Sequence, residues 1–540
     1  MVLNPVRAAK ILVDAGVIRP YRPSRLLRVG AAVVGWGLGT AGGSISLAAR
    51  FPDEIGLVDD IGELTFEQIH RRSNALARGL AERGVGEGDA VAVMCRNHRY
   101  FIESSFAIAR LGADILYVNT SFAGPQLVGV LEREKPTMVI HDEEFAGLLD
   151  KVDVDLQQLV AWSDADPGED GCEGVIAATD DADLSSPDRQ SRSTILTSGT
   201  TGTPKGASRG AAGVGGVGAA VSLLSALPLK TRWTTHIAAP LFHTWGWAHF
   251  QLSMLLGSTM ILTRRFEPDR CMELVAEHCC KSLVVIPVML SRILEAVGPD
   301  GETPTSYDVR SLAVVAASGS ALPGDLSTSW MDAYGDNLYN IYGSTECALA
   351  TIASPADLRA APGTAGRAPM GTDVRLFDDQ DRPVSGDGPG RIFVGNSMLF
   401  EGYTSGGSKD VIGDLMATGD VGRFDSAGRL FVEGRDDDMI VSGGENVFPQ
   451  EVEDLLSRHD AVVEVAAIGV ADERFGQRLR AFVVVRSDAD VSEVDLKDHV
   501  KANLARYKVP REIIFLDELP RNATGKIVKR DLATYDRDDQ

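Results

Sequence analysis

Short apolar runs alternate with segments of helical spacing between residues 55 and 334. From Phe66 to Gly84, the apolar residues Ile69, Leu76 and Leu80 fall on one helical face, and Val91–Met94 follows as an apolar strand. The same alternation predicts strands at Ala113–Val118, Thr137–His141, His236–Pro240, Thr259–Thr263, Ser282–Ile286 and Leu312–Ala317. It predicts helices at Tyr100–Leu111, Pro125–Glu134, Trp247–Leu256, Met272–His278, Met289–Ala296 and Asp325–Tyr334. This order of elements favours an α/β fold with parallel sheets.

The pattern changes twice further along the chain. Residues 366–431 read as short strands with many Gly and Pro turns, which predicts a small β-barrel-like subdomain or a distorted sheet. From Asp437 onward a compact α+β domain is expected, with helices Pro449–Arg458 and Asp495–Leu504 and strands Val462–Val470, Ala481–Val485 and Arg511–Phe515. We therefore divide the chain into an extension (1–50), a large domain (51–436) and a small mobile C-terminal domain (437–540). Residues 163–191 are acidic and rich in Ser and Gly, and are expected to form a surface loop.

The extension contains an uncharged stretch from Val29 to Ala49, flanked by Arg25, Arg28 and Arg50. Its length would suit a membrane span, but its six glycines and few large aliphatic residues make it a poor one. We expect a helix packed on the body of the protein, with peripheral membrane contact as the alternative. No cleavable signal peptide is evident.

Composition narrows the functional classes. The 540 residues carry a net charge of −23, which argues against nucleic-acid binding, since that requires a basic face. Six cysteines without a CxxC pair indicate neither a disulfide framework nor a zinc site. A reducing cytoplasm is the simplest compartment.

The segment Thr197–Gly206 has the composition of a phosphate-binding loop. It follows the apolar run Thr194–Leu196 and combines three glycines, Lys205 and hydroxyl residues at four of its first five positions. Glycines let backbone N–H groups approach a ligand, and the lysine adds a positive charge. The loop lacks the Gly-Lys-Ser/Thr triplet of a Walker A motif at the required spacing. Its candidate ligand residues are Thr197, Ser198, Gly199, Thr200, Thr201, Gly202 and Lys205.

This loop resembles the phosphate-binding signature of the adenylate-forming enzymes, which include acyl-CoA synthetases, nonribosomal adenylation domains and luciferases. Further segments resemble motifs of the same superfamily and occur in its order: Pro240–Trp247, Ala317–Pro323, Tyr339–Glu346, Thr418–Gly422, Gly434–Ile440, Ser442–Pro449 and Leu519–Ile527. Together they extend over nearly the whole chain, so the ordered set is far more specific than any one of them.

The resemblance implies a nucleotide site. Tyr342 would offer its ring face to adenine, Thr345 its hydroxyl to the α-phosphate, and Glu346 a hard oxygen ligand to Mg²⁺. Asp420 would accept hydrogen bonds from the ribose hydroxyls, and Arg435 would reach ribose or phosphate. The matching segments add Gly319, Ser320, Ala321, Tyr339, Asn340, Gly343 and Ser344 to the nucleotide-binding residues.

The resemblance also implies catalytic and acyl-binding residues. Lys526 matches the catalytic lysine, whose ammonium would offset charge at the α-phosphate, and Glu346, Thr200 and His243 would act with it. Trp247 resembles a gate on an acyl tunnel, with Gly319 and Gly343 in the acyl pocket. Asp437 would be the hinge between the domains, and Gly443 and Gly444 would let the pantetheine arm of CoA pass.

The expected function is ATP-dependent activation of a fatty acid to an acyl-adenylate, followed by transfer to CoA with release of AMP and pyrophosphate. The partners are then small molecules: ATP with Mg²⁺, the acid and CoA. Two alternatives stay open: delivery of the acyl group to a carrier protein, and use of another carboxylic acid. Amino-acid activation and a non-catalytic nucleotide-binding protein are less favoured. Peripheral membrane contact and a homodimer also remain open.

Overall fold

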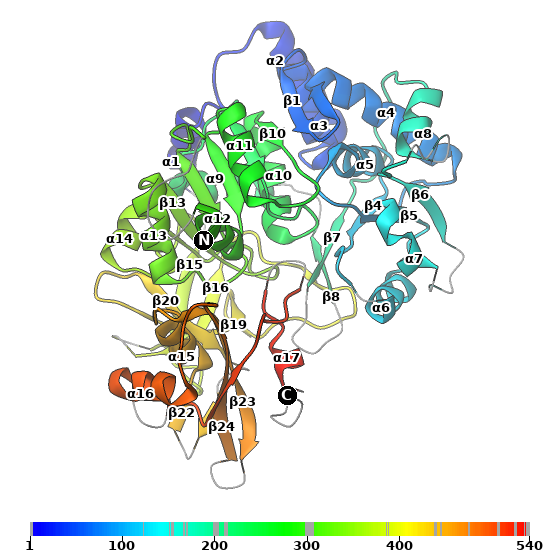
Figure 1. The fold of residues 1–540 in the computed structure, drawn as a ribbon. Helices are drawn as coiled ribbons and strands as arrows, with labels where there is room; N and C mark the ends of the chain where they lie inside the picture. The colour runs from blue at the N-terminus through cyan, green and yellow to red at the C-terminus, as the bar shows by residue number, and fades with distance from the viewer. Residues whose placement is uncertain are drawn as a thin grey trace.

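The structure is a computed structural model that describes residues 4–122, 124–150, 152, 156–165, 168, 171–197, 205–209, 214–297, 307–384, 386, 388–436, 440–442, 445–472, 476–504, 508–522, 526–533 and 535. In this part of the chain the strands form four sheets, A to D. Figure 1 shows the N-terminal helices at the top, sheets A and B side by side below them, and the C-terminal domain at the bottom.

Sheet A has eight strands and is parallel except at its two edges. Its order is β14 (Thr351–Ala353), β13 (Leu338–Tyr342), β12 (Val314–Ala317), β11 (Ser282–Val285), β9 (Thr234–Ile237), β10 (Thr259–Ile261), β1 (Ile55–Asp59) and β2 (Gly62–Thr65). Sheet B has seven strands in the order β17 (Gly402–Tyr403), β8 (Lys205–Arg209), β7 (Ser193–Thr197), β4 (Asp114–Tyr117), β3 (Ala90–Met94), β5 (Met138–His141) and β6 (Gln157–Val160). The predicted parallel α/β architecture is confirmed.

The helices that cover these sheets are α4 (Phe66–Glu82), α5 (Arg99–Arg110), α6 (Gly124–Glu134), α7 (Ala146–Leu149), α9 (Val214–Ala226), α10 (Thr244–Leu256), α11 (Pro268–Glu277), α12 (Pro287–Val297), α13 (Gly324–Tyr334) and α14 (Pro355–Ala360), with a 3-10 turn at Glu143–Phe145. The short helices α7 and α14 were not predicted, whereas α4, α5, α6, α10, α11, α12 and α13 occur where the spacing of apolar residues predicts them. The start of α4 shows why. Thr65 and Gln68 form a capping box, and Ile69, Leu76 and Leu80 are buried.

The two smaller sheets are mainly antiparallel. Sheet C contains β15 (Asp373–Phe377), β16 (Gly390–Gly395), β19 (Leu415–Phe424), β18 (Val411–Ile412) and β20 (Leu430–Arg435). Irregular registers at Arg391–Phe393 and Val421–Gly422 make it the expected distorted sheet. Sheet D contains β22 (Glu445–Val447), β21 (Ile440–Ser442), β24 (Gly476–Val485), β23 (Val462–Asp472) and β25 (Glu512–Phe515), with α15 (Pro449–Leu456), α16 (Glu493–Asn503) and α17 (Lys529–Leu532) beside it.

The N-terminal extension differs from the expected single helix. It forms α1 (Pro5–Asp14), α2 (Pro23–Trp36) and α3 (Thr40–Arg50), and the stretch from Val29 to Ala49 is broken between α2 and α3. Gly37 has a φ of 76°, and a Cβ on Gly42 would lie 1.9 Å from the carbonyl oxygen of Gly37. Glycine at both positions lets the chain reverse tightly, so α3 is buried while α2 lies outside it.

The acidic region 163–191 also departs from the expected loop. It contains helix α8 (Cys172–Ala178), which packs against α4. Cys172 is fully buried, and Arg72 on α4 binds Glu173 at 2.7 Å. Composition missed this helix because it is only seven residues long and lies within an otherwise acidic region.

None of the described helices combines the length and apolar character needed to cross a bilayer.

Candidate active site

A cavity of about 2020 Å³ lies beyond the carboxyl ends of the neighbouring parallel strands β11, β12 and β13. Residues directly after these strands line it, including Pro287, Gly319 and Gly343, and sheets C and D close it from below. This is the edge where open α/β sheets bind ligands, because loops from adjacent strands converge there.

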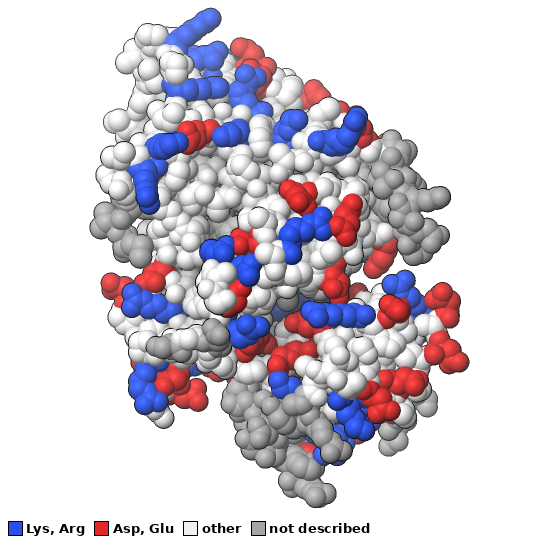
Figure 2. Space-filling model, turned by 90° about the vertical axis from the view of Figure 1, so that its left-hand side faces the viewer, with Lys and Arg blue, Asp and Glu red and all other residues white. Residues whose placement is uncertain are grey.

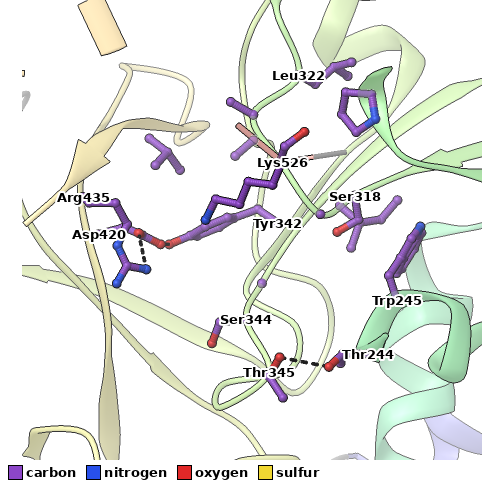
Figure 3. Close-up of a pocket in the computed structure, with 18 of the residues that line it drawn as sticks. Thr244, Trp245, Ser318, Leu322, Tyr342, Ser344, Thr345, Asp420, Arg435 and Lys526 are labelled. Atoms are coloured by element: carbon purple, nitrogen blue, oxygen red, sulfur yellow. Dashed lines mark hydrogen bonds and ion pairs between the residues drawn. The ribbon is translucent and has the colours of Figure 1, made fainter. Parts of the chain in front are cut away.

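One corner of the cavity joins Tyr342, Asp420 and Arg435, which come from three different strands. The phenol of Tyr342 donates to Asp420 Oδ2 at 2.5 Å, and Arg435 Nη1 lies 3.3 Å from Asp420 Oδ1 (Figure 3). Asp420 and Arg435 are direct cross-strand partners on β19 and β20. Burial raises the pKa of Asp420, while the charge of Arg435 and the Tyr342 hydrogen bond act in the opposite direction. The three residues expected at adenine and ribose are therefore brought together.

The loop after β13 turns sharply. A Cβ on Gly343 would lie 1.8 Å from the carbonyl oxygen of Ala348, so no other residue fits there. The hydroxyl of Ser344 accepts from the N–H of Cys347 at 3.0 Å, which fixes the turn. The hydroxyls of Thr345 and Thr244 lie 3.0 Å apart and connect this loop to the start of α10 (Figure 3). Glycine is thus needed at 343 for a tight turn, although the residue also lines the cavity.

Glu346 has a partner that the sequence did not indicate. The phenol of Tyr403 donates to Glu346 Oε1 at 2.8 Å, and Lys205 Nζ lies 5.0 Å from the centre of the same ring. All three side chains line the cavity. Tyr403 therefore orients the carboxylate of Glu346, the expected Mg²⁺ ligand, and positions it beside Lys205 of the phosphate loop.

Most of the phosphate loop lies outside the described residues, as do the hinge and pantetheine positions. These are Ser198, Gly199, Thr200, Thr201, Gly202, Asp437, Gly443 and Gly444. The two ends of the loop are described: Thr197 and Lys205 are paired across β7 and β8. Because Lys205 lines the cavity, the loop starts and ends at the site.

Lys526 lies in the cavity although it belongs to the C-terminal domain. Its backbone N–H donates to the Asn522 side chain at 3.0 Å, and its carbonyl accepts from the Asn522 N–H at 2.9 Å, which closes a turn. Figure 3 shows its side chain extending toward Tyr342 and Asp420. The charge of Lys526 opposes the rise in the pKa of Asp420 that burial causes. Burial, with a smaller contribution from the charge of Lys526, lowers the pKa of His243 to about 4. His243 is therefore neutral at physiological pH.

A branch of the cavity continues between α9 and α10. Beyond His243, the residues of α9, of α10 and of the turn after α2 that line it are small or apolar, with Gln251 as the polar exception: Leu38, Gly216, Val217, Ala219, Ala220, Leu223, Trp247, Ala248, Gln251, Leu252 and Leu255. Trp247 is half-buried at its entrance, and its indole N–H has no acceptor among the described residues. Gly319 has a φ of 100° and brings its backbone to the cavity wall together with Ser320 and Ala321.

Some expected residues do not take part as expected. Tyr339 does not line the cavity but packs half-buried against the main core. Asn340 reaches the lining, yet its amide donates to the Thr364 carbonyl at 3.0 Å and is buried. Residues that the sequence reasoning missed, besides Tyr403, are Thr244 and Lys409, which also line the cavity. Thr244 lies within the segment Pro240–Trp247 but was given no role, and Lys409 lies outside all the matching segments.

A group of buried residues lies apart from this site. Cys95, His98 and Asp142 place potential metal-ligand atoms within 4.8 Å of one another, and none of them lines the cavity. His98 Nε2 lies 2.8 Å from Asp142 Oδ1, so the group is held together by its own hydrogen bonding.

Comparison with known proteins identifies the family of the chain. Residues 46–404 match the AMP-binding enzyme family, and residues 451–526 match the AMP-binding enzyme C-terminal domain. The chain is 32% identical over 490 residues to a 2-succinylbenzoate–CoA ligase of Geobacillus kaustophilus, covering 89% of this chain and 95% of the relative. It is 29% identical to a long-chain-fatty-acid–CoA ligase of Mycobacterium tuberculosis, covering 86% and 92%.

A solved structure of an anthranilate–CoA ligase with anthranoyl-AMP has a TM-score of 0.83 and 25% identity, and the match covers 92% of this chain and 96% of that one. The chain therefore belongs to the AMP-binding enzymes of the adenylate-forming superfamily, as an AMP-forming acid–CoA ligase that uses ATP and CoA as substrates.

Proposed function

We propose that the acid activated by this enzyme is a fatty acid of medium or long chain. The observation that supports the proposal is the branch between α9 and α10. From Thr244 to Leu255, α10 follows this branch over twelve residues, or about 16 Å of helix. A slot of that length with small and apolar walls suits an extended alkyl chain better than a single ring.

The charge of the branch supports the same substrate class. Beyond His243, none of the described residues that line it is Lys, Arg or His. A second carboxylate, such as the one in 2-succinylbenzoate, would be buried there without a cation, which is unfavourable.

The chemistry assigned to the site needs three sources of positive charge. Lys205 and Lys526 are two of them, and Mg²⁺ carried by ATP would be held by Glu346, whose hard oxygen ligands suit this ion. The substrate carboxylate attacks the α-phosphorus, and pyrophosphate leaves. Lys526 offsets charge at the reacting phosphate, and neutral His243 separates the nucleotide from the acyl branch. Rotation of the C-terminal domain about Asp437 would then remove Lys526 and bring Gly443 and Gly444 to the site for attack by the CoA thiol.

A panel of acids tests the proposal. Release of AMP is measured with octanoate, dodecanoate, hexadecanoate, 2-succinylbenzoate and indoleacetate, each with and without CoA. The expected result is the highest kcat/KM for a fatty acid of the panel, with turnover that requires CoA. A higher kcat/KM for either ring-bearing acid would refute the substrate class. AMP release without stimulation by CoA would instead favour delivery to a carrier protein.

A variant within the branch sharpens the test. Ala248 on α10 lines the branch beyond Trp247, so Ala248→Phe should fill its inner part. We expect the preferred chain to shorten while the KM for ATP stays unchanged. Val494→Glu on the exposed face of α16 is the matched control, because Val494 is 64% exposed and far from the branch lining. An unchanged chain-length profile for Ala248→Phe would show that the acyl chain lies elsewhere.

A further inference from the structure

The exposed apolar residues of this protein are concentrated in its N-terminal helices. Val6 is 76% exposed, Leu27 75% and Val34 89%, and the described residues Val13, Ile18, Leu26 and Leu38 are exposed as well. Most remaining residues of this kind are scattered singly over the other domains. A cluster of this sort on one surface marks a site of contact with another apolar surface.

The arrangement along α2 is that of an interfacial helix. Leu27, Ala31 and Val34 follow helical spacing and are all exposed, while Ala32 on the opposite side is buried. The helix is fourteen residues long, so it extends about 21 Å along the surface. On α1, Val6 and Val13 are exposed while Ile11 and Leu12 pack against the main core. Both helices are therefore apolar on two sides, one facing the protein and one facing outward.

The charge of this region is opposite to that of the rest of the protein. Residues 1–38 contain six basic residues and one acidic residue, whereas the whole chain has a net charge of −23. The basic residues Arg7, Lys10, Arg22 and Arg28 are exposed. Figure 2 shows basic side chains predominating at the upper end of the molecule, where α2 lies in Figure 1. An anionic surface would be repelled by most of the protein and attracted here.

We propose that α1 and α2, with the turn at Leu38, form a docking surface for an anionic lipid bilayer. The outward apolar residues enter the boundary between headgroups and acyl chains, and the arginines bind the lipid phosphates. The protein then rests on the membrane without crossing it. A second copy of the chain is the competing occupant, but two such basic surfaces would repel each other.

The position of this surface connects it to the acyl branch. Leu38, at the end of α2, is 47% exposed and also lines the branch. Beside it, the amide of Gln251 on α10 donates to the hydroxyl of Thr40 at 3.4 Å. A docked protein would therefore hold the far end of the acyl branch against the bilayer, where a fatty acid is dissolved. This second step rests on the proposed function, whereas docking itself does not.

Vesicle sedimentation tests the docking. The full-length protein is mixed with vesicles of equal parts phosphatidylcholine and phosphatidylglycerol, and with vesicles of phosphatidylcholine alone. We expect pelleting with the anionic vesicles that weakens as salt is added. Leu27→Glu with Val34→Glu should weaken binding by roughly tenfold or more, because each apolar side chain loses its transfer free energy. Arg22→Gln with Arg28→Gln should weaken it by about fivefold per charge.

The matched control is Val411→Glu with Val494→Glu. These valines are 54% and 64% exposed but lie in sheet C and in the C-terminal domain, so vesicle binding should not change. The proposal is overturned if the wild type does not pellet with anionic vesicles, or if the α2 variants pellet as well as the wild type. It is also overturned if light scattering shows a dimer that the Leu27 and Val34 substitutions dissociate. Sedimentation uses neither acid nor nucleotide, so its failure leaves the proposed ligase activity untouched.

Discussion

Replacing Arg435 with Gln should change how ATP binding depends on pH. Arg435 Nη1 lies 3.3 Å from Asp420 Oδ1, and the Asp420 side chain is only 13% exposed. Burial is the largest influence on this carboxyl and raises its pKa, and Arg435 is the first of the groups that lower it. Without Arg435 the effect of burial is opposed by less positive charge, so the pKa of Asp420 must rise further.

The size of the effect follows from the distance and the remaining charges. An opposite charge within 4–6 Å lowers a carboxyl pKa by about 1–3 units. Lys526 and Lys409 still oppose the effect of burial on the pKa of Asp420 in the variant. We therefore take the lower end of this range as the expected rise. A rise of about 1 unit corresponds to about 1.4 kcal/mol, so the affinity for ATP falls by up to tenfold at a pH below the pKa of Asp420 in both proteins.

The sign is fixed by the chemistry of the ribose contact. An ionised Asp420 accepts hydrogen bonds from two hydroxyls, and a protonated one loses acceptor capacity. Affinity for ATP is therefore present above the pKa of Asp420 and lost as the pH falls through it. In Arg435→Gln the loss should begin at a higher pH, by about 1 unit.

The assay is the KM for ATP from pyrophosphate release, measured from acid to mildly alkaline pH. Asp420→Asn is the control, and its KM should be high and independent of pH over this range. If the wild-type and Arg435→Gln curves are parallel and differ only by a constant factor, Arg435 acts through a direct contact with ATP. The coupling to Asp420 would then be wrong.

Three further predictions concern single side chains. Lys526→Ala should slow adenylate formation by about 10²–10³-fold, because it removes charge stabilisation at the phosphate. Thioester formation from supplied acyl-adenylate should stay intact. An equal loss in both half-reactions would contradict a role of Lys526 in adenylate formation alone. Tyr403→Phe keeps the ring beside Lys205 but removes the hydrogen bond to Glu346. The KM for Mg²⁺–ATP should therefore rise by roughly tenfold. A titration with Mg²⁺ that matches the wild type would exclude a role of Tyr403 in orienting Glu346. Burial lowers the pKa of His249 to about 3. Below pH 6.5 the unfolded chain therefore binds a proton at His249 that the folded chain does not bind. The free energy of unfolding falls as the pH drops through this range. His249→Phe should reduce the dependence of the free energy of unfolding on pH by about 1.4 kcal/mol per pH unit between about pH 6 and pH 4. Denaturant titration at each pH measures this dependence. If the dependence is the same as in the wild type, His249 is not the group responsible.

The sequence predicted the parts of the site that occupy adjacent positions in glycine-rich or charged motifs. Tyr342, Thr345, Asp420, Arg435 and Lys526 all lie in the cavity as expected. Short motifs are informative because the backbone must approach a ligand there, and few residue types allow that.

The residues that the sequence did not reveal act across long separations. Tyr403 is 57 positions from Glu346, and it reaches Glu346 because β17 adds to the edge of β8, where Gly402 pairs with Ser208. Such pairing depends on tertiary structure, and a single tyrosine in a turn carries no local signal. Tyr339 shows the reverse: it lies within a strong motif, yet it packs against the core. A motif therefore identifies a segment and leaves the direction of each side chain to the sheet.

Helix α10 is anchored at both of its ends, at the nucleotide site and at α3. At its start, a Cβ on Gly246 would lie 2.2 Å from the Pro240 carbonyl oxygen, and the indole of Trp245 donates to the Val285 carbonyl at 3.1 Å. At its far end, Arg50 donates to the Leu255 carbonyl at 2.9 Å. Because the helix is fixed to the nucleotide site at one end and to α3 at the other, the length of the branch is set by side chains along α10 and α9. The N-terminal helices thus help to define the acyl branch as well as to cover it, so chain length and membrane contact should respond to changes in the same region.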